Sequence, residues 1–227
     1  MTPSKIRPDR QFTREHDRLN SGMPGSPTEY LAGTDLVSAA DDGIAGRALH
    51  PFIAVMPAAG AKAKYNGEWA GPWEQSIVAD VVPWVDAHLA TIDSASGRTL
   101  AGLSAGGFGA FDIGLRNSSL FGAIESWSGY FSPLHDGPFK HAPKSVLRAN
   151  DPMLLAQTDR RTLTEEHTRF FLSTGPYHSH WFRPGETTTF AAELRGLGLP
   201  VTTFVYPQAK GQWVAQVDVG LTWAFGT

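Results

Sequence analysis

The most constraining feature of the chain is a serine set between glycines at the end of a short apolar run. Residues 98–117 read RTLAGLSAGGFGAFDIGLRN and contain the pattern Gly-x-Ser-x-Gly around Ser104. Residues 98–103 predict a strand and residues 106–117 predict a helix, so Ser104 falls at a strand-to-helix turn. Small neighbours let the strand and the helix approach closely and present the serine hydroxyl. Ser104 is therefore a candidate nucleophile, and the competing interpretation is a plain glycine-rich turn.

The remainder of the chain alternates between short apolar runs and amphipathic segments. Strands are predicted at residues 51–57, 98–103, 121–129, 169–175 and 201–207. Helices are predicted at residues 77–89 with a kink at Pro83, at 106–117, at 188–198 and in a final segment carrying Trp213, Val217, Leu221 and Phe225. This alternation is typical of an α/β fold with a mostly parallel sheet and helices on both faces. With 227 residues, we expect a single domain.

Composition excludes several classes of function. The net charge is −3 and no run of Lys or Arg exceeds two residues, so we expect neither a nucleic-acid partner nor a membrane partner. The chain has no cysteine, which excludes disulfides, thiolate metal sites and cysteine nucleophiles. Nucleotide-binding glycine motifs are also missing from the sequence, and we expect no cofactor and no metal.

Two segments fall outside the regular pattern. Residues 1–18 have the character of a divergent or disordered N-terminus and lack the apolar stretch of a signal peptide. We therefore expect a cytoplasmic protein, or a secreted one if an upstream signal segment is missing. Residues 132–168 are polar, contain prolines and have weak periodicity, which favours a lid or an irregular excursion.

The serine motif is one of several segments that are informative when taken together in their order along the chain. They are GMPGSPTEYL at 22–31, PFIAVMPAAG at 51–60, GPWEQSIVADVVPWVDAHL at 71–89, GLSAGGFGAFDIGLRN at 102–117 and ESWSGYFSP at 125–133. Over residues 19–225, the chain resembles the esterase family of α/β-hydrolases that includes esterase D, feruloyl esterases, enterochelin esterases and mycolyltransferases. The resemblance implies an α/β-hydrolase fold and serine-dependent hydrolysis of small-molecule carboxylic esters through an acyl-serine.

The same resemblance implies an oxyanion hole made of two backbone N–H groups. One belongs to the residue after the nucleophile, here Ala105, and the other follows the glycine-rich strand end, here Met23. A surface turn rich in Gly and Pro is the alternative interpretation of the segment around Met23.

The base and the acid of a catalytic triad depart from the family pattern. After the last predicted strand, Lys210 occupies the position where the family has a histidine, and no histidine occurs after His180. The acid is expected after residues 169–175, but no carboxylate occurs there before Glu186. The polar segment 11–21 also departs from the apolar first strand of the family.

Three interpretations of these departures remain open. The triad has decayed, which leaves a weak hydrolase or a non-catalytic relative that binds a ligand or a protein. Alternatively, His178 or His180 supplies the base from a neighbouring loop. In the third interpretation Lys210 is the base, which requires burial to lower its pKa from about 10.4 toward neutrality. The carboxylates that could orient a histidine are Asp136, Asp151 and Glu186.

Aromatic residues near the carboxyl ends of the predicted strands are candidates for substrate contact. Trp127 and Tyr130 follow the strand after the serine turn, at the edge where α/β sheets collect ligands. Trp73 lies in a stretch after another predicted strand and could stack a substrate ring. The alternative for Trp73 is packing under a loop.

Overall fold

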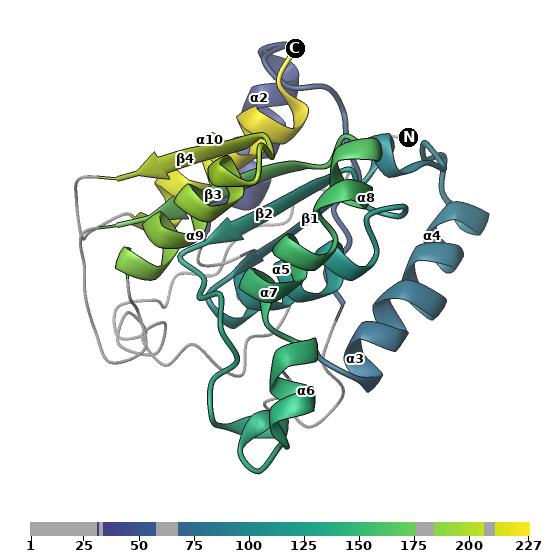
Figure 1. The fold of residues 1–227 in the computed structure, drawn as a ribbon. Helices are drawn as coiled ribbons and strands as arrows, with labels where there is room; N and C mark the ends of the chain where they lie inside the picture. The colour runs from purple at the N-terminus through teal and green to yellow at the C-terminus, as the bar shows by residue number, and fades with distance from the viewer. Residues whose placement is uncertain (1–30, 32–33, 58–67, 176–183, 207–211) are drawn as a thin grey trace, which may run out of the picture.

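The computed structural model of this chain describes residue 31 and residues 34–57, 68–175, 184–206 and 212–227. At its centre lies a parallel four-stranded sheet whose strands are ordered as they occur in the chain (Figure 1). The strands are β1 (Thr99–Leu103), β2 (Ala123–Trp127), β3 (Arg169–Thr174) and β4 (Val201–Val205). Because all four run in the same direction, their carboxyl ends meet at one edge of the sheet.

Helices cover both faces of this sheet (Figure 1). One face carries α5 (Ala105–Arg116), α7 (Pro152–Thr158), α8 (Arg160–Glu165) and α9 (Pro184–Gly196). The other face carries α2 (Leu36–Ala45) and α10 (Gln212–Phe225). Residues of β3 alternate between the two, since Phe170 and Leu172 pack in the first layer and Phe171 in the second. The predicted α/β fold is thereby confirmed.

The helix predicted over residues 77–89 is part of a continuous helical run from residue 72 to residue 88 beside α5, and the run has three segments. They are α3 (Pro72–Gln75), a π-helix at Ser76–Val81 and α4 (Val82–His88). The Val82 N–H bonds the carbonyl of Ile77, five residues back, immediately before Pro83. Proline lacks an N–H and clashes with the preceding helical turn, so the wider π turn accommodates it. Ile77 is buried against Ile113 and Phe121.

Residues 51–57 do not form the strand that their composition predicts. Leu49, just before them, makes an isolated antiparallel bridge with Gly226, but 51–57 themselves have no regular structure. The side chains of Ile53 and Val55 are 49% and 45% exposed. Apolar composition alone cannot make a strand, because each strand needs the backbone groups of a neighbour. Within the described residues, β1 pairs with β2 only.

Residues 132–168 contain more regular structure than their weak periodicity indicates. A short 3-10 turn at Gly137–Phe139 is followed by α6 (Lys144–Ala149), α7 and α8. Ala156 of α7 and Leu163 of α8 are fully buried in the core beside α5. Another 3-10 turn, at Ala95–Gly97, leads into β1.

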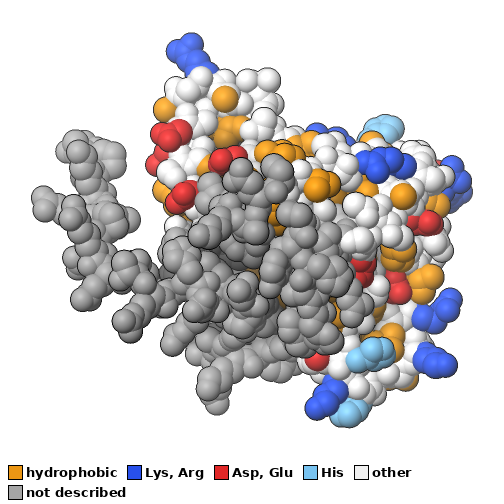
Figure 2. All heavy atoms as spheres, turned by 90° about the vertical axis from the view of Figure 1, so that its left-hand side faces the viewer, with side chains coloured by type: hydrophobic (Ala, Val, Ile, Leu, Met, Phe, Trp, Pro, Cys, Tyr) orange, Lys and Arg blue, Asp and Glu red, His pale blue; other side chains and the backbone are white. Residues whose placement is uncertain are grey.

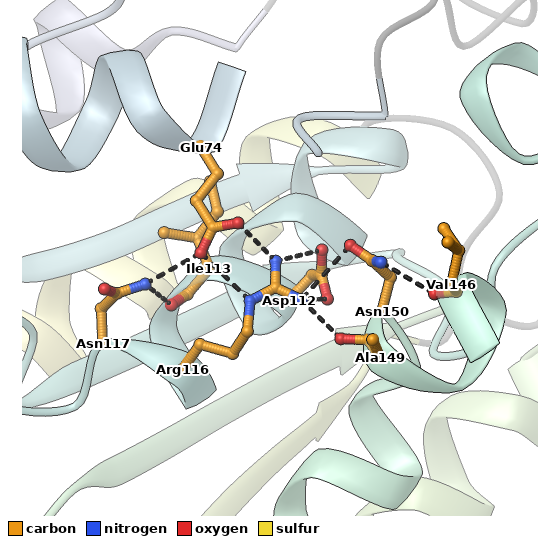
Figure 3. A network of polar contacts seen from close by, with 8 residues as sticks. All are labelled: Glu74, Asp112, Ile113, Arg116, Asn117, Val146, Ala149 and Asn150. Atoms are coloured by element: carbon orange, nitrogen blue, oxygen red, sulfur yellow. Dashed lines mark hydrogen bonds and ion pairs between the residues drawn. The ribbon is translucent and has the colours of Figure 1, made fainter. Parts of the chain in front are cut away.

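One guanidinium joins three of these helices (Figure 3). Arg116, at the end of α5, donates to both carboxylate oxygens of Glu74 on α3, at 3.0 and 2.8 Å. It also donates to both oxygens of Asp112, one turn back, at 2.9 and 2.8 Å, and to the Ala149 carbonyl at the end of α6 at 2.7 Å. Burial raises the pKa of Asp112 to about 7, although the charge of Arg116 opposes this shift.

We expect Arg116→Met to lower the free energy of unfolding by about 3 kcal/mol, because it leaves the fully buried Asp112 carboxyl without its cation. Urea titration followed by circular dichroism measures the change. The matched control is Arg161→Met, whose ion pair with Glu165 is exposed and should contribute less than about 0.5 kcal/mol. Equal losses in the two variants would contradict a structural role for the Arg116 contacts.

Candidate active site

Ser104 occupies the turn between β1 and α5, with φ 55° and ψ −117°. A positive φ is unusual for a residue with a side chain and is a mark of backbone strain. Hydrogen bonds hold this conformation on both sides: the Ser104 N–H donates to the Trp127 carbonyl at 2.9 Å, and the Ser104 carbonyl accepts from Gly107 and Phe108. The local geometry is that of a serine on a sharp strand-to-helix turn.

The glycines around Ser104 are required by close backbone approach. A Cβ added at Gly102 would lie 2.1 Å from the carbonyl oxygen of Gly106. One added at Gly107 would lie 2.4 Å from the Ser126 hydroxyl on β2. The helix therefore begins directly against the strand that precedes it, which a larger residue at either position would prevent.

We expect Gly102→Ala to destabilise the fold by at least about 3 kcal/mol or to prevent soluble expression, because its methyl group collides with backbone. The control is Gly185→Ala in the first turn of α9, where an added Cβ meets no atom within 4 Å. That change should be neutral or stabilising by up to about 1 kcal/mol. Thermal unfolding of both variants makes the comparison, and a stable Gly102→Ala protein would disprove the close approach.

Of the two predicted oxyanion donors, the structure describes Ala105. It is the first residue of α5 and is buried, and helix geometry leaves its N–H without an acceptor inside the helix. The positive end of the α5 dipole also favours a developing negative charge at this point. Met23 lies outside the described residues.

The candidate bases His178, His180 and Lys210 also lie outside the described residues. The strand ends that precede them are described: Thr174 closes β3 and Val205 closes β4. Both strand ends are at the same edge of the sheet as Ser104, the edge that faces the viewer in Figure 2. Basic and histidine side chains gather at the lower right rim of this view.

Two of the three candidate orienting carboxylates have hydrogen bonds that hold other elements. Asp151 caps α7 by accepting from the N–H groups of Met153 and Leu154. Glu186, in the first turn of α9, accepts from the Phe131 N–H at 2.8 Å and from the Ser132 hydroxyl.

The third candidate, Asp136, has a buried Oδ1 that finds no hydrogen-bond donor in the described part of the chain.

The three candidate aromatic residues lie in different surroundings. Trp73 is half-buried in the short helix α3. Trp127 is 5% exposed and packs in the core on the α10 face, with its indole N–H donating to Glu125 at 2.9 Å. Burial therefore makes Trp127 a core residue in this structure.

Tyr130 is buried beside the start of α5, where its ring stacks on Phe108 at a centroid distance of 5.1 Å. Its hydroxyl donates to the carboxylate of Glu68, which is 1% exposed. Burial, together with the charge of Glu68, raises the pKa of Tyr130, so the phenol stays protonated as the donor. Sequence analysis gave no signal for Glu68, a single acidic residue in a glycine-rich stretch.

Glu125 is a buried carboxyl on the α10 side of the sheet, and it is 1% exposed. It lies on β2 against Gly220 of α10, and a Cβ at Gly220 would approach its Oε2 to 2.5 Å. Burial raises the pKa of Glu125 to about 8, while the hydrogen bond from Trp127 opposes the shift. The folded protein therefore binds a proton here more tightly than the unfolded chain does.

This shift predicts a loss of stability with rising pH. The contribution of Glu125 is complete below its unfolded pKa of 4.5 and is lost as pH rises through about 8, at up to about 1.4 kcal/mol per pH unit. Glu125→Gln keeps an acceptor for Trp127 and should flatten this dependence, leaving the part due to Asp112. Unfolding titrations at intervals from pH 5 to 8.5 test this, with the exposed Glu166→Gln as control. A wild-type slope in Glu125→Gln would refute the assignment.

Within the described ranges, no group of three or more His, Asp or Glu side chains is arranged to hold a metal ion. Nor does any helix in those ranges have the length and hydropathy needed to cross a membrane.

Comparison with known sequences identifies a family, and the curated relatives include two proteins of Mycobacterium tuberculosis. The family model described as "Putative esterase" matches residues 25–198. Two curated Mycobacterium tuberculosis proteins, both named as esterases and from different strains, are each 36% identical to the chain over 84 residues. That alignment covers 35% of this chain and 18% of each relative, so it spans less than a fifth of their length.

Comparison with solved structures agrees on the fold. A ferulic acid esterase superposes with a TM-score of 0.72 at 18% identity, covering 88% of this chain and 80% of its own. A fluorophosphonate-binding serine hydrolase of Staphylococcus aureus gives 0.69 at 17% identity, covering 89% and 80%. The protein MPT51 of Mycobacterium tuberculosis gives 0.60 at 16% identity and covers 84% of both chains.

Proposed function

Because this chain belongs to the "Putative esterase" family, whose relatives share its α/β-hydrolase fold, we propose that it hydrolyses small-molecule carboxylic esters through an acyl-serine on Ser104. The observation that carries the proposal is the strained backbone of Ser104, with φ 55° at the start of a buried helix. Strain of this kind persists where the surrounding structure holds it, and it clusters at active sites.

The reaction proceeds in two stages. The Ser104 oxygen attacks the acyl carbon as a base removes its proton, and the resulting oxyanion is bound by the N–H groups of Ala105 and Met23. Collapse of this intermediate breaks the ester C–O bond, and the alcohol leaves with the proton. Water then attacks the acyl-serine, releasing the carboxylic acid and restoring the Ser104 hydroxyl.

The base for this reaction comes from a segment that follows β3 or β4. His178 and His180 follow β3, and Lys210 follows β4 at the family's histidine position. A neutral imidazole accepts a proton near pH 7 without further adjustment, whereas Lys210 requires a lowered pKa. Asp136, whose buried Oδ1 finds no donor among the described residues, is the candidate that would orient a histidine. Trp73, Trp127 and Tyr130 are the candidates for substrate contact.

A non-catalytic relative that binds a ligand or protein is the second candidate. Two features favour it: Lys210 stands where a histidine is expected, and residues 176–181, PYHSHW, carry no carboxylate. In this case the fold and Ser104 remain while the proton acceptor has been lost. Because the curated relatives are matched over only 18% of their length, their own activity does not decide between the candidates.

Hydrolysis of para-nitrophenyl esters from acetate to octanoate distinguishes the ester hydrolase from the non-catalytic relative. We expect the wild-type protein to exceed Ser104→Ala in kcat/KM by at least about a hundredfold, because removing the nucleophile removes the covalent route. Ser119→Ala, at an exposed serine beyond α5, is the matched control and should retain full activity. A fluorophosphonate probe should label the wild type and Ser119→Ala but not Ser104→Ala.

The activity of the Lys210→His variant tests the second candidate, the non-catalytic relative. If the wild type is no faster than Ser104→Ala while Lys210→His gains turnover, the protein is a hydrolase scaffold that has lost its base. If the wild type is active, His178→Ala and His180→Ala locate the base.

A further inference from the structure

Four polar side chains form a buried hydrogen-bonded cluster at the carboxyl edge of the sheet, on the α10 face. They are Ser128, Ser173, Tyr206 and Gln216, and each is 3% exposed or less. We call this set the hydroxyl–amide cluster. Its surroundings are apolar, since Phe171 of β3 and Val217 of α10 pack in the same layer.

The hydrogen bonds of the cluster have a defined direction. Ser128 donates to the Gln216 side-chain oxygen at 2.8 Å, and Ser173 donates to the same oxygen at 2.7 Å. The one hydroxyl hydrogen of Ser128 is thereby used, so Tyr206 donates its own to the Ser128 oxygen, at 2.8 Å. Burial raises the pKa of Tyr206 and keeps this donor protonated.

Backbone contacts connect the cluster to the nucleophile. Ser128 has φ 52°, and its N–H bonds the Ser173 carbonyl at 2.8 Å. The residue before it, Trp127, provides the carbonyl that accepts the N–H of Ser104. Tyr206 is tied to the end of β3 by its N–H, which bonds the Thr174 carbonyl at 3.0 Å. Ser128 and Tyr206 thus connect the turn that carries Ser104 to the ends of β3 and β4.

The members of the cluster flank the segments that hold every candidate base. Ser173 is the second-last residue of β3, shortly before His178 and His180 in the sequence. Tyr206 directly follows β4, and Gln216 lies in the first half of α10. In the sequence, one precedes Lys210 and the other follows it. The cluster therefore holds the described strand ends from which both segments continue in the sequence.

We propose that the hydroxyl–amide cluster is a positioning device that fixes the turn carrying Ser104 relative to the ends of β3 and β4, with Tyr206 as its central positioning residue. The inference rests on the proposed ester hydrolysis. Tyr206 does not contact the reacting atoms; it acts through Ser128, whose neighbour Trp127 holds Ser104. Buried polar networks of this kind specify one arrangement where apolar packing would allow several.

Tyr206→Phe tests the proposal because it removes one hydroxyl, keeps the ring and leaves the Ser128–Gln216 hydrogen bond in place. With para-nitrophenyl acetate, we expect kcat to fall by about ten- to a hundredfold, since small misplacements of catalytic groups are costly. KM and the far-ultraviolet circular dichroism spectrum should stay close to those of the wild type. The control Thr168→Val deletes another fully buried hydroxyl, which lies at the opposite end of β3, and should leave kcat unchanged.

A second variant guards against a purely structural effect. Ser128→Ala removes the acceptor of Tyr206, so the double variant Tyr206→Phe/Ser128→Ala should lose no more kcat than the more impaired single variant. Multiplicative losses would overturn the proposal, because they mean that the two residues act independently.

The outcomes separate this inference from the proposed function. A wild type no faster than Ser104→Ala overturns both. An active wild type whose kcat is unchanged within twofold in Tyr206→Phe overturns the positioning role alone. A loss of kcat in Tyr206→Phe that Thr168→Val shares would also overturn it, because any buried hydroxyl would then have the same effect.

Discussion

Contact between the backbones of Gly102 and Gly106 is the constraint on which the rest of the structure depends. It brings α5 directly against β1, and α5 is then buried along almost its whole length. A helix enclosed in this way must be apolar or paired all round, and its one buried carboxyl, Asp112, is accordingly held by Arg116. The same contact forces Ser104 into a positive φ and directs α5 with its N-terminus at the carboxyl edge of the sheet.

Polar groups buried around this centre fall into two kinds. Asp112 and Glu125 are carboxyls whose burial favours the protonated form, so they weaken the fold as pH rises. Ser128 and Gln216 are neutral groups with hydrogen-bond partners of matching geometry, and they carry no such dependence. The neutral cluster lies at the edge where chemistry is expected.

The sequence was sufficient to predict most of the fold, because the period of apolar residues distinguishes strands from helices. It failed at residues 51–57, where a strand depends on a neighbour that local pattern does not reveal. It also failed to predict the π turn before Pro83, which is set by packing as much as by the proline.

At the site, the glycine pattern located Ser104 and Ala105. The partners of Tyr206 lie 78 residues away at Ser128 and elsewhere along the chain, beyond any local signal. The catalytic roles of all these residues remain predictions: Ser104, Ala105, His178, His180, Lys210 and Met23.

The order of the strands has a consequence for how the chain acquires its structure. Since β1, β2, β3 and β4 are neighbours in the sheet in the order of synthesis, each new strand can dock on the one before it without waiting for a distant segment. The helices α5, α7, α8 and α9 are made between these strands and cover one face as it grows. The other face, with Phe171, is covered by α2, which is made before the sheet, and by α10, which is made after β4. A nascent chain therefore leaves the part of this apolar face that α10 covers exposed until α10 emerges, and this interval is when it most needs protection from self-association.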